Sequence, residues 1–231
     1  MHLPNRKITR QITVDFYYGL GSRYSYLAAS QLPKIEAETN CKFIWKPIYS
    51  GDLMGLREQN PFSQHPISGQ YNSAYRSQDA KRWADYYHIP FHEPKISALH
   101  PQDLALLTLA AGSFNLLVEY SQAMFDAIFA QGIEIDEQVA IAVAKNLSIP
   151  ENQFLQIHAS PDTKDQLTSL TREAFDRGAF GVPTFFVEEE MFWGNDRLVL
   201  LVDFLKKLQE KGIDSAPISG FITKLSKPYK I

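Results

Sequence analysis

The chain has 231 residues, of which 45% are hydrophobic and 13% aromatic. This length fits one large domain, or one domain with a substantial insertion, and the composition indicates a packed core rather than disorder. The net charge of −3, without a basic patch, argues against nucleic acid as a partner. The single cysteine, Cys41, excludes an intramolecular disulfide framework, C-x-x-C redox chemistry and cysteine-rich zinc sites.

The N-terminal segment does not resemble a signal peptide. Residues 1–10 are polar and lack the apolar stretch of a signal peptide. No apolar run approaches the roughly 20 residues that span a bilayer. We therefore expect a soluble cytoplasmic protein that has no membrane partner.

The first predicted elements form a β-α-β unit. Residues 12–18 alternate between two faces, which is typical of a strand. Residues 23–39 have apolar side chains at helical spacing and predict a helix that Pro33 kinks. Residues 42–49 predict a second strand, with Pro47 at its end or at an irregularity. Because a helix joins the two strands, we expect them to be parallel with a right-handed crossover.

The middle of the chain is predicted to be helical. Residues 59–71 are rich in turn-forming residues and predict a loop. Helical periodicity then continues to about residue 177 and is punctuated by prolines. The predicted helices cover residues 72–88, 101–112, 114–131, 134–146, 150–158 and 162–177.

Strand character returns only near the C-terminal end. Residues 183–187 and 191–193 predict a hairpin, and residues 196–210 predict a helix. The order is therefore β-α-β, a long helical segment, then β-β-α. This order predicts an α/β protein with a thioredoxin-like fold, interrupted by a large all-helical insert.

We expect this fold to be organised in two units. Residues 11–53 and 178–212 would form a discontinuous thioredoxin-like domain, and residues 54–177 a helical insertion domain. Residues 213–231 would form a C-terminal tail without a readable pattern. The sequence contains no internal repeat.

Ser22 stands where the first strand ends and the first helix begins. Serine is among the preferred N-cap residues, which is the simplest explanation for its presence. A helix N-terminus also presents unpaired N–H groups and a positive dipole end, which favour a thiolate. Because Cys41 lies elsewhere, thiol chemistry at this position requires a thiol that is supplied by a cofactor.

Two further segments bear on the same site. The bond between Val182 and Pro183 is either a trans bond at a strand start or a cis bond. The β-α-β pattern upstream and the β-β-α pattern downstream favour cis. Asn195 or Asp196 is a good N-cap for the last helix. Alternatively, backbone N–H groups at this helix start bind a ligand carboxylate while Asp196 binds the ammonium group of the same ligand. The γ-glutamyl end of glutathione carries both groups.

Other interpretations of the sequence find less support. Residues 19–24 (GLGSRY) partly match a dinucleotide-binding fingerprint, but Tyr24 stands where that motif needs glycine or alanine. Serine hydrolase chemistry would need a G-x-S-x-G sequence, which the chain lacks at this junction. His88 and His92 have i,i+4 spacing, but Pro90 between them breaks the helix. We therefore expect no metal site.

Taken together, these motifs resemble the 2-hydroxychromene-2-carboxylate isomerases and the kappa-class glutathione transferases of the DsbA-like thioredoxin superfamily. The resemblance rests on residues 15–28, 178–184 and 191–198, and residues 79–84 with 89–91 resemble part of the family's helical insert. It implies a glutathione-dependent enzyme that isomerises a small aromatic acid from cis to trans or back. In such an enzyme, the glutathione thiolate adds to the conjugated substrate, a bond rotates and the thiolate leaves.

The resemblance also implies roles for single residues. Ser22 falls on the serine that binds the glutathione sulfur. Val182, which precedes Pro183, falls on the residue whose backbone pairs with the cysteinyl unit. The other glutathione contacts implied by the resemblance fall on Asn60, Asn195 and Asp196.

The sequence departs from the family pattern at two positions. The family usually has proline after the serine, whereas this chain has Arg23. A cation there either lowers the pKa of the thiolate or obstructs the substrate. Kappa-class members also have a lysine for the glycyl carboxylate, and the nearest position here is Ser68. We expect an aromatic-lined substrate pocket that includes Arg23, Tyr24, Tyr49 and Trp193.

Two alternatives to the isomerase stay open. The first is a kappa-like transferase that joins glutathione permanently to an electrophile. The second is a binding module that has lost its redox cysteine and recognises peptides through Val182 and the loop of Pro183. Arg23 and the missing lysine favour this second alternative. The resemblance further implies a homodimer.

Overall fold

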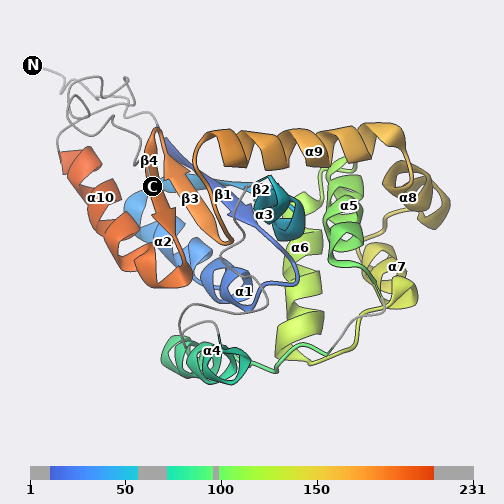
Figure 1. The fold of residues 1–231 in the computed structure, drawn as a ribbon, viewed down its shortest axis with the longest axis horizontal. Helices are drawn as coiled ribbons and strands as arrows, with labels where there is room; N and C mark the ends of the chain where they lie inside the picture. The colour runs from blue at the N-terminus through green and yellow to red at the C-terminus, as the bar shows by residue number, and fades with distance from the viewer. Residues whose placement is uncertain (1–10, 57–71, 96–98, 211–231) are drawn as a thin grey trace, which may run out of the picture.

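The computed structural model describes residues 11–56, 72–95 and 99–210 (Figure 1). Four strands form one sheet in the order β2-β1-β3-β4. The parallel pairing of β1 with β2 is confirmed, and β3 runs antiparallel to both β1 and β4. The strands are β1 (Ile12–Tyr18), β2 (Cys41–Pro47), β3 (Thr184–Val187) and β4 (Glu190–Trp193).

The continuous helix predicted for residues 23–39 is wrong. The chain forms α1 (Arg23–Ala29) and then a separate helix, α2 (Leu32–Thr39). Pro33 lies in the first turn of α2, where its missing N–H removes no intrahelical hydrogen bond. The proline therefore opens a second helix instead of kinking a single one.

The described chain between β2 and β3 is helical, as predicted. The short helix α3 was not predicted, and the helix predicted for 114–131 begins later and ends in a π-helical turn, η2. A 3-10 turn, η3 (Asn195–Arg197), and α10 (Leu198–Glu210) follow β4. The helices between β2 and β3 are α3 (Ser50–Gly55), α4 (Ser73–Tyr87), α5 (Pro101–Gly112), α6 (Leu117–Phe125), η2 (Asp126–Ala130), α7 (Glu137–Asn146), α8 (Glu151–His158) and α9 (Pro161–Asp176).

The helices cover both faces of the sheet. Figure 1 shows α5, α6, α7 and α8 grouped at one end of the sheet, and α9 running from this group back to β3. Phe16 belongs to the large core and stacks on Phe185 at 5.0 Å between ring centroids. Tyr17, the next residue, is also fully buried and packs with Phe186 in a second core. The side chains of β1 therefore alternate between two faces as predicted, but near the end of the strand both faces are buried.

A polar cluster joins α9 to the sheet, and we call it the β1–α9 cluster: Asp15, Tyr17, Lys46, Glu173 and Arg177. Arg177 Nη1 lies 2.6 Å from Asp15, and Lys46 Nζ lies 3.1 Å from Asp15 and 2.8 Å from Glu173. The Tyr17 hydroxyl donates to Glu173 at 2.8 Å. Burial opposes ionisation of Glu173, but hydrogen bonds from Lys46 and Tyr17 outweigh it and lower its pKa. The cluster therefore holds a charged contact between the insert and the central strand.

His158 lies at the end of α8, and its Nε2 atom is buried without a hydrogen-bond partner among the described residues. Asp103 Oδ1 lies 4.0 Å away. Burial lowers the pKa of His158, and the charges of Asp103 and Glu137 offset this only in part. The unfolded chain then binds the proton more readily than the folded one. The contribution of His158 to stability is therefore complete above about pH 6.5 and is lost as the pH falls.

We expect His158→Gln to weaken the loss of stability on acidification between about pH 7 and 5, because the variant has no imidazole to protonate. Urea unfolding at a series of pH values measures this dependence. His88→Gln is the matched control, since His88 is exposed at the end of α4. Equal pH dependence in the wild type and in His158→Gln would contradict this account.

Within the ranges given above, no group of three or more His, Cys, Asp and Glu side chains could hold a metal ion. The same part of the chain contains no helix with the length and apolarity needed to cross a membrane. His88 adopts a left-handed backbone conformation, with φ of 56°, where α4 ends.

Candidate functional site

Ser22 is the N-cap of α1. Its Oγ accepts a hydrogen bond from the N–H of Ser25 at 3.2 Å, and its own N–H donates to the carbonyl of Gly19 at 3.0 Å. The cap explains why a serine is placed here. It uses only an acceptor position of the hydroxyl, and the side chain is half-buried. The Ser22 hydroxyl therefore still has a proton to donate to a ligand.

The loop before β3 lies against the loop that carries Ser22. The bond between Val182 and Pro183 is cis, as predicted. A Cβ atom built on Gly19 would lie 3.6 Å from Cγ2 of Val182. The two loops therefore lie close together, although Gly19 and Val182 are 163 positions apart in the sequence (182 − 19).

The junction between β4 and α10 is tied to the same loop. The N–H of Gly194 donates to the carbonyl of Pro183 at 2.9 Å. Gly194 has a φ of 104°, which glycine adopts readily, and a Cβ here would lie 2.5 Å from Asp196 Oδ1. The following turn, η3, also contacts α1. The fold therefore brings three separate segments together at one end of the sheet.

Asn195 is the buried polar residue of this junction. It is 3% exposed, and its Nδ2 atom has no hydrogen-bond partner among the described residues. Leaving such a donor unpaired costs about 1–3 kcal/mol. Gly194 is the N-cap of η3, without a side-chain capping bond, and Asp196 is exposed and pairs with Arg197 at 2.8 Å. The N-cap position of η3 is thus taken by Gly194 and not by Asn195 or Asp196.

Arg23 and Tyr24, predicted to line a substrate pocket, face α4 and the segment that follows it. Arg23 Nη2 lies 2.5 Å from Glu93 Oε1. The Tyr24 hydroxyl donates to Asp79 Oδ2 at 2.9 Å. Burial raises the pKa of Tyr24 to about 12, and the hydrogen bond to Asp79 adds to the effect. Tyr24 is therefore a neutral hydrogen-bond donor near pH 7.

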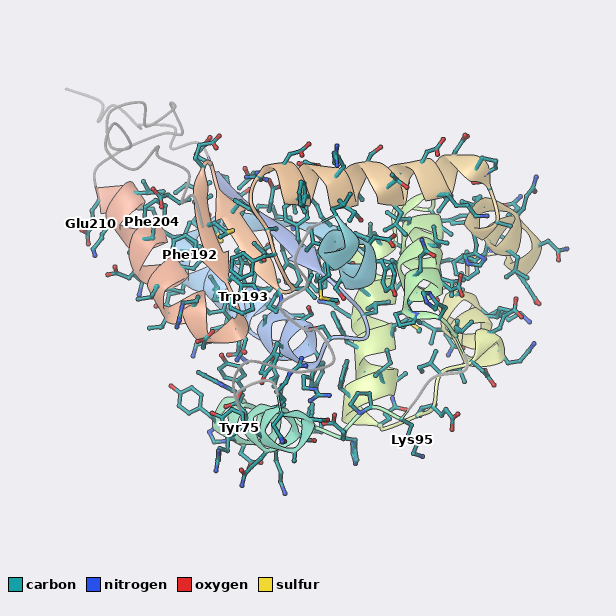
Figure 2. All side chains as sticks on the ribbon, viewed as in Figure 1. Tyr75, Lys95, Phe192, Trp193, Phe204 and Glu210 are labelled. Atoms are coloured by element: carbon teal, nitrogen blue, oxygen red, sulfur yellow. The ribbon has the colours of Figure 1, made fainter. Side chains whose placement is uncertain are left out.

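Trp193 and Tyr49 occupy different surroundings. Trp193, labelled in Figure 2, packs against Phe180 at 4.6 Å between ring centroids, beside the loop of Pro183. Tyr49 lies 5.2 Å from the ring of His100 and packs against apolar residues of α5 and α9. Trp193 thus adjoins the loop of Pro183 and the junction between β4 and α10, whereas the contacts of Tyr49 lend no support to its predicted place in the pocket. Asn60 and Ser68 lie outside the described residues.

The sequence did not single out Tyr87 or Phe180. The hydroxyl of Tyr87, on α4, donates to the carbonyl of Asn195 at 3.4 Å. The sequence placed Tyr87 only within the helix predicted for residues 72–88. Nothing in the sequence relates it to a residue 108 positions away. Phe180 is identified as part of this region only by its packing against Trp193.

Comparisons with known proteins bear on the family and the fold of the chain. Residues 13–206 match the family model described as DSBA-like thioredoxin domain. A 2-hydroxychromene-2-carboxylate isomerase from Pseudomonas sp. (strain C18) is 28% identical over 214 residues, covering 90% of this chain and 93% of the relative. Human glutathione S-transferase kappa 1 is 25% identical over 215 residues, covering 84% and 90%.

A solved structure of a 2-hydroxychromene-2-carboxylate isomerase superposes with a TM-score of 0.72 at 24% identity, covering 89% of this chain and all of that one. This likeness shows the thioredoxin-like fold. The curated relatives named above are isomerases and glutathione transferases, which supports an enzyme and confirms the resemblance. The chain belongs to the DSBA-like thioredoxin domain family.

Proposed function

We propose that the protein is a glutathione-dependent isomerase of a small aromatic acid. The observation that carries this proposal is the convergence of Ser22, the loop of Pro183 and the η3 turn, where Asn195 has an unpaired buried donor. The curated isomerase and transferase relatives support the same reading. Bound glutathione would supply a thiolate that adds reversibly to the substrate's conjugated double bond.

Ser22 would hold the sulfur of glutathione. Its hydroxyl proton is free to be donated, because the cap to Ser25 uses only an acceptor position. A hydrogen bond to an ionised acceptor contributes about 1.5–3 kcal/mol. Such a bond would favour the thiolate over the thiol near neutral pH.

The η3 turn would hold the γ-glutamyl end. Asn195 Nδ2 would donate to the ligand carboxylate, together with backbone N–H groups at the start of η3 and α10. Asp196 is exposed and could pair with the ligand ammonium in place of Arg197. Val182 would offer its backbone groups to the cysteinyl unit, since it lies between the Ser22 loop and η3. The residues present therefore fit the sulfur of glutathione and the two charged groups of its γ-glutamyl end.

We expect glutathione to raise the thermal unfolding temperature of the wild type, because a ligand that binds only the folded state stabilises it. At about 100 times its dissociation constant, such a ligand adds about 2.7 kcal/mol. Asp196→Asn should reduce the shift, since the amide cannot pair with the ammonium. Asp203→Asn, which removes an exposed pair with Lys207 on α10, should leave the shift unchanged.

The dipeptide cysteinylglycine provides a second control, because it carries the thiol without the γ-glutamyl group. It should give a smaller shift than glutathione. If millimolar glutathione does not change the thermal unfolding temperature at all, the proposal is wrong and a peptide-binding module becomes the better interpretation. If glutathione binds, isomerisation without its consumption supports the isomerase, whereas its stoichiometric consumption would assign a transferase.

A further inference from the structure

Two arginines lie on either side of the contact between α1 and α4. Arg23 follows Ser22 directly, and the guanidinium carbon of Arg76, on α4, lies 5.9 Å from the ring centroid of Tyr24. Burial lowers the pKa of Arg23, Glu93 opposes this, and the positive charge of Arg76 adds to it. The fold thus holds two like charges near each other beside the candidate site.

The nearby carboxylates do not satisfy both guanidinium groups. Glu93 pairs with Nη2 of Arg23 and also accepts from the Ser77 hydroxyl at 2.6 Å. Asp79 accepts from the Tyr24 hydroxyl. Among the described residues, Arg76 has no ion pair, and Nη1 of Arg23 is buried without a hydrogen-bond partner. Buried donors in folded proteins nearly always have an acceptor, so this arrangement calls for one.

We propose that Arg23 and Arg76 form a binding site for a ligand carboxylate between α1 and α4, beside Ser22. A guanidinium group binds a carboxylate through two parallel N–H bonds, and a second guanidinium strengthens the attraction. The site makes an anionic carboxylic acid the preferred ligand class. The identity of the carboxylate rests on the proposed function, because it belongs either to the substrate acid or to the glycyl end of glutathione.

Titration calorimetry with paired probes tests this site. The first pair is benzylidenepyruvate and its methyl ester, each titrated in the presence of S-methylglutathione, which has no thiol to react. If the site holds the substrate acid, Arg23→Met and Arg76→Met should each weaken the acid about tenfold or more and leave the ester unchanged, because only the acid makes charge-assisted bonds. Arg82→Met is the matched control on α4, since Arg82 is exposed, and it should change neither affinity.

The second pair distinguishes the two sources of the carboxylate. Glutathione and its glycyl ethyl ester differ only in the charge of the glycyl end. If the arginine variants weaken glutathione but not this ester, the site holds the glycyl carboxylate. If they weaken benzylidenepyruvate instead, the site holds the substrate. Either result supports a carboxylate site.

Glu93→Gln separates ligand recognition from a purely structural ion pair. If Arg23 serves only to hold Glu93, then Arg23→Met and Glu93→Gln should weaken acid binding to the same extent. Recognition predicts the opposite for Glu93→Gln, which keeps or increases the affinity for the acid because it removes a competing carboxylate. If Arg23→Met does not fold, Arg76→Met still tests the site, because Arg76 has no ion pair to lose in the described part of the chain.

An unchanged ratio of acid to ester affinity, for both probe pairs, in Arg23→Met and Arg76→Met would overturn the carboxylate site. If the pKa of the bound glutathione thiol, measured by thiolate absorbance, then rises in Arg23→Met, the role of Arg23 is to stabilise the thiolate. Failure of the proposed function gives another result. The protein would then bind no glutathione, but Arg23 and Arg76 would still make it bind the acid more tightly than the ester.

Discussion

Replacing Ser22 with alanine is expected to lower turnover with glutathione about 100-fold, a magnitude typical for the loss of one donor to a developing or bound anion. The physical reason is the loss of a hydrogen bond to the sulfur, which raises the pKa of the bound thiol and depletes the thiolate. Steady-state kinetics at saturating glutathione measure the effect. The pH optimum should move upward in the variant.

The control for this experiment must lose a helix cap without touching the site. Ser160 caps α9 through the same bond, from the N–H of Thr163 at 3.2 Å, so Ser160→Ala should cost a similar stability of about 1 kcal/mol. Its turnover should stay near that of the wild type. Ser22→Thr keeps a hydroxyl and should restore part of the activity. Equal turnover in Ser22→Ala and Ser160→Ala would show that Ser22 is only a cap.

Replacing Arg177 with alanine is expected to lower the free energy of unfolding by about 2–3 kcal/mol. The variant loses the bond to Asp15 at 2.6 Å, the bond to the Tyr17 hydroxyl at 3.2 Å and the bond to the Glu188 carbonyl at 2.8 Å. It also loses the packing of the guanidinium over Phe186, 4.0 Å from the ring centroid. Asp15 and Tyr17 would be left with fewer partners, which makes the loss larger than that of an exposed pair. Urea unfolding measures the change.

Arg172→Ala serves as the comparison, because Arg172 lies on α9 and pairs with Asp176 at 3.6 Å with both side chains largely exposed. An exposed pair of this kind contributes about 0.2–1 kcal/mol. A loss in Arg177→Ala no greater than that in Arg172→Ala would mean that the β1–α9 cluster adds no more stability than an ordinary surface pair.

The elements with strong local patterns could be predicted from the sequence. Alternation identified β1, strand character identified the hairpin of β3 and β4, and helical periodicity and prolines located most helices of the insert within a few residues. The break between α1 and α2 could not be placed, because Pro33 fits both a kinked helix and the first turn of a new one. Helix α3 was missed because six residues with two glycines show no helical period.

The candidate site was predictable where its residues stand at the junctions of elements. Ser22, Val182 and Asn195 each mark such a junction, so chain order and the resemblance were enough to group them. The partners of Arg23 and Tyr24 depend on how α4 lies against α1, which no local pattern encodes. Likewise, the bond between Arg177 and Asp15 joins residues 162 positions apart, and only the packing of α9 on the sheet creates it.

Helix α4 is fastened to the rest of the molecule in an unusual way for a fifteen-residue helix, since its fully buried side chains are Ala80 and Ala84. Its other ties are polar contacts from Tyr24 to Asp79 and from Tyr87 to the carbonyl of Asn195, and the packing of the partly buried Trp83 and Tyr87 against the core. Because the buried side chains of α4 are small, we expect substitutions on this helix to be tolerated better than substitutions on any strand of the aromatic core. For laboratory evolution of substrate range, α4 is therefore the segment to randomise, with these two alanines kept fixed.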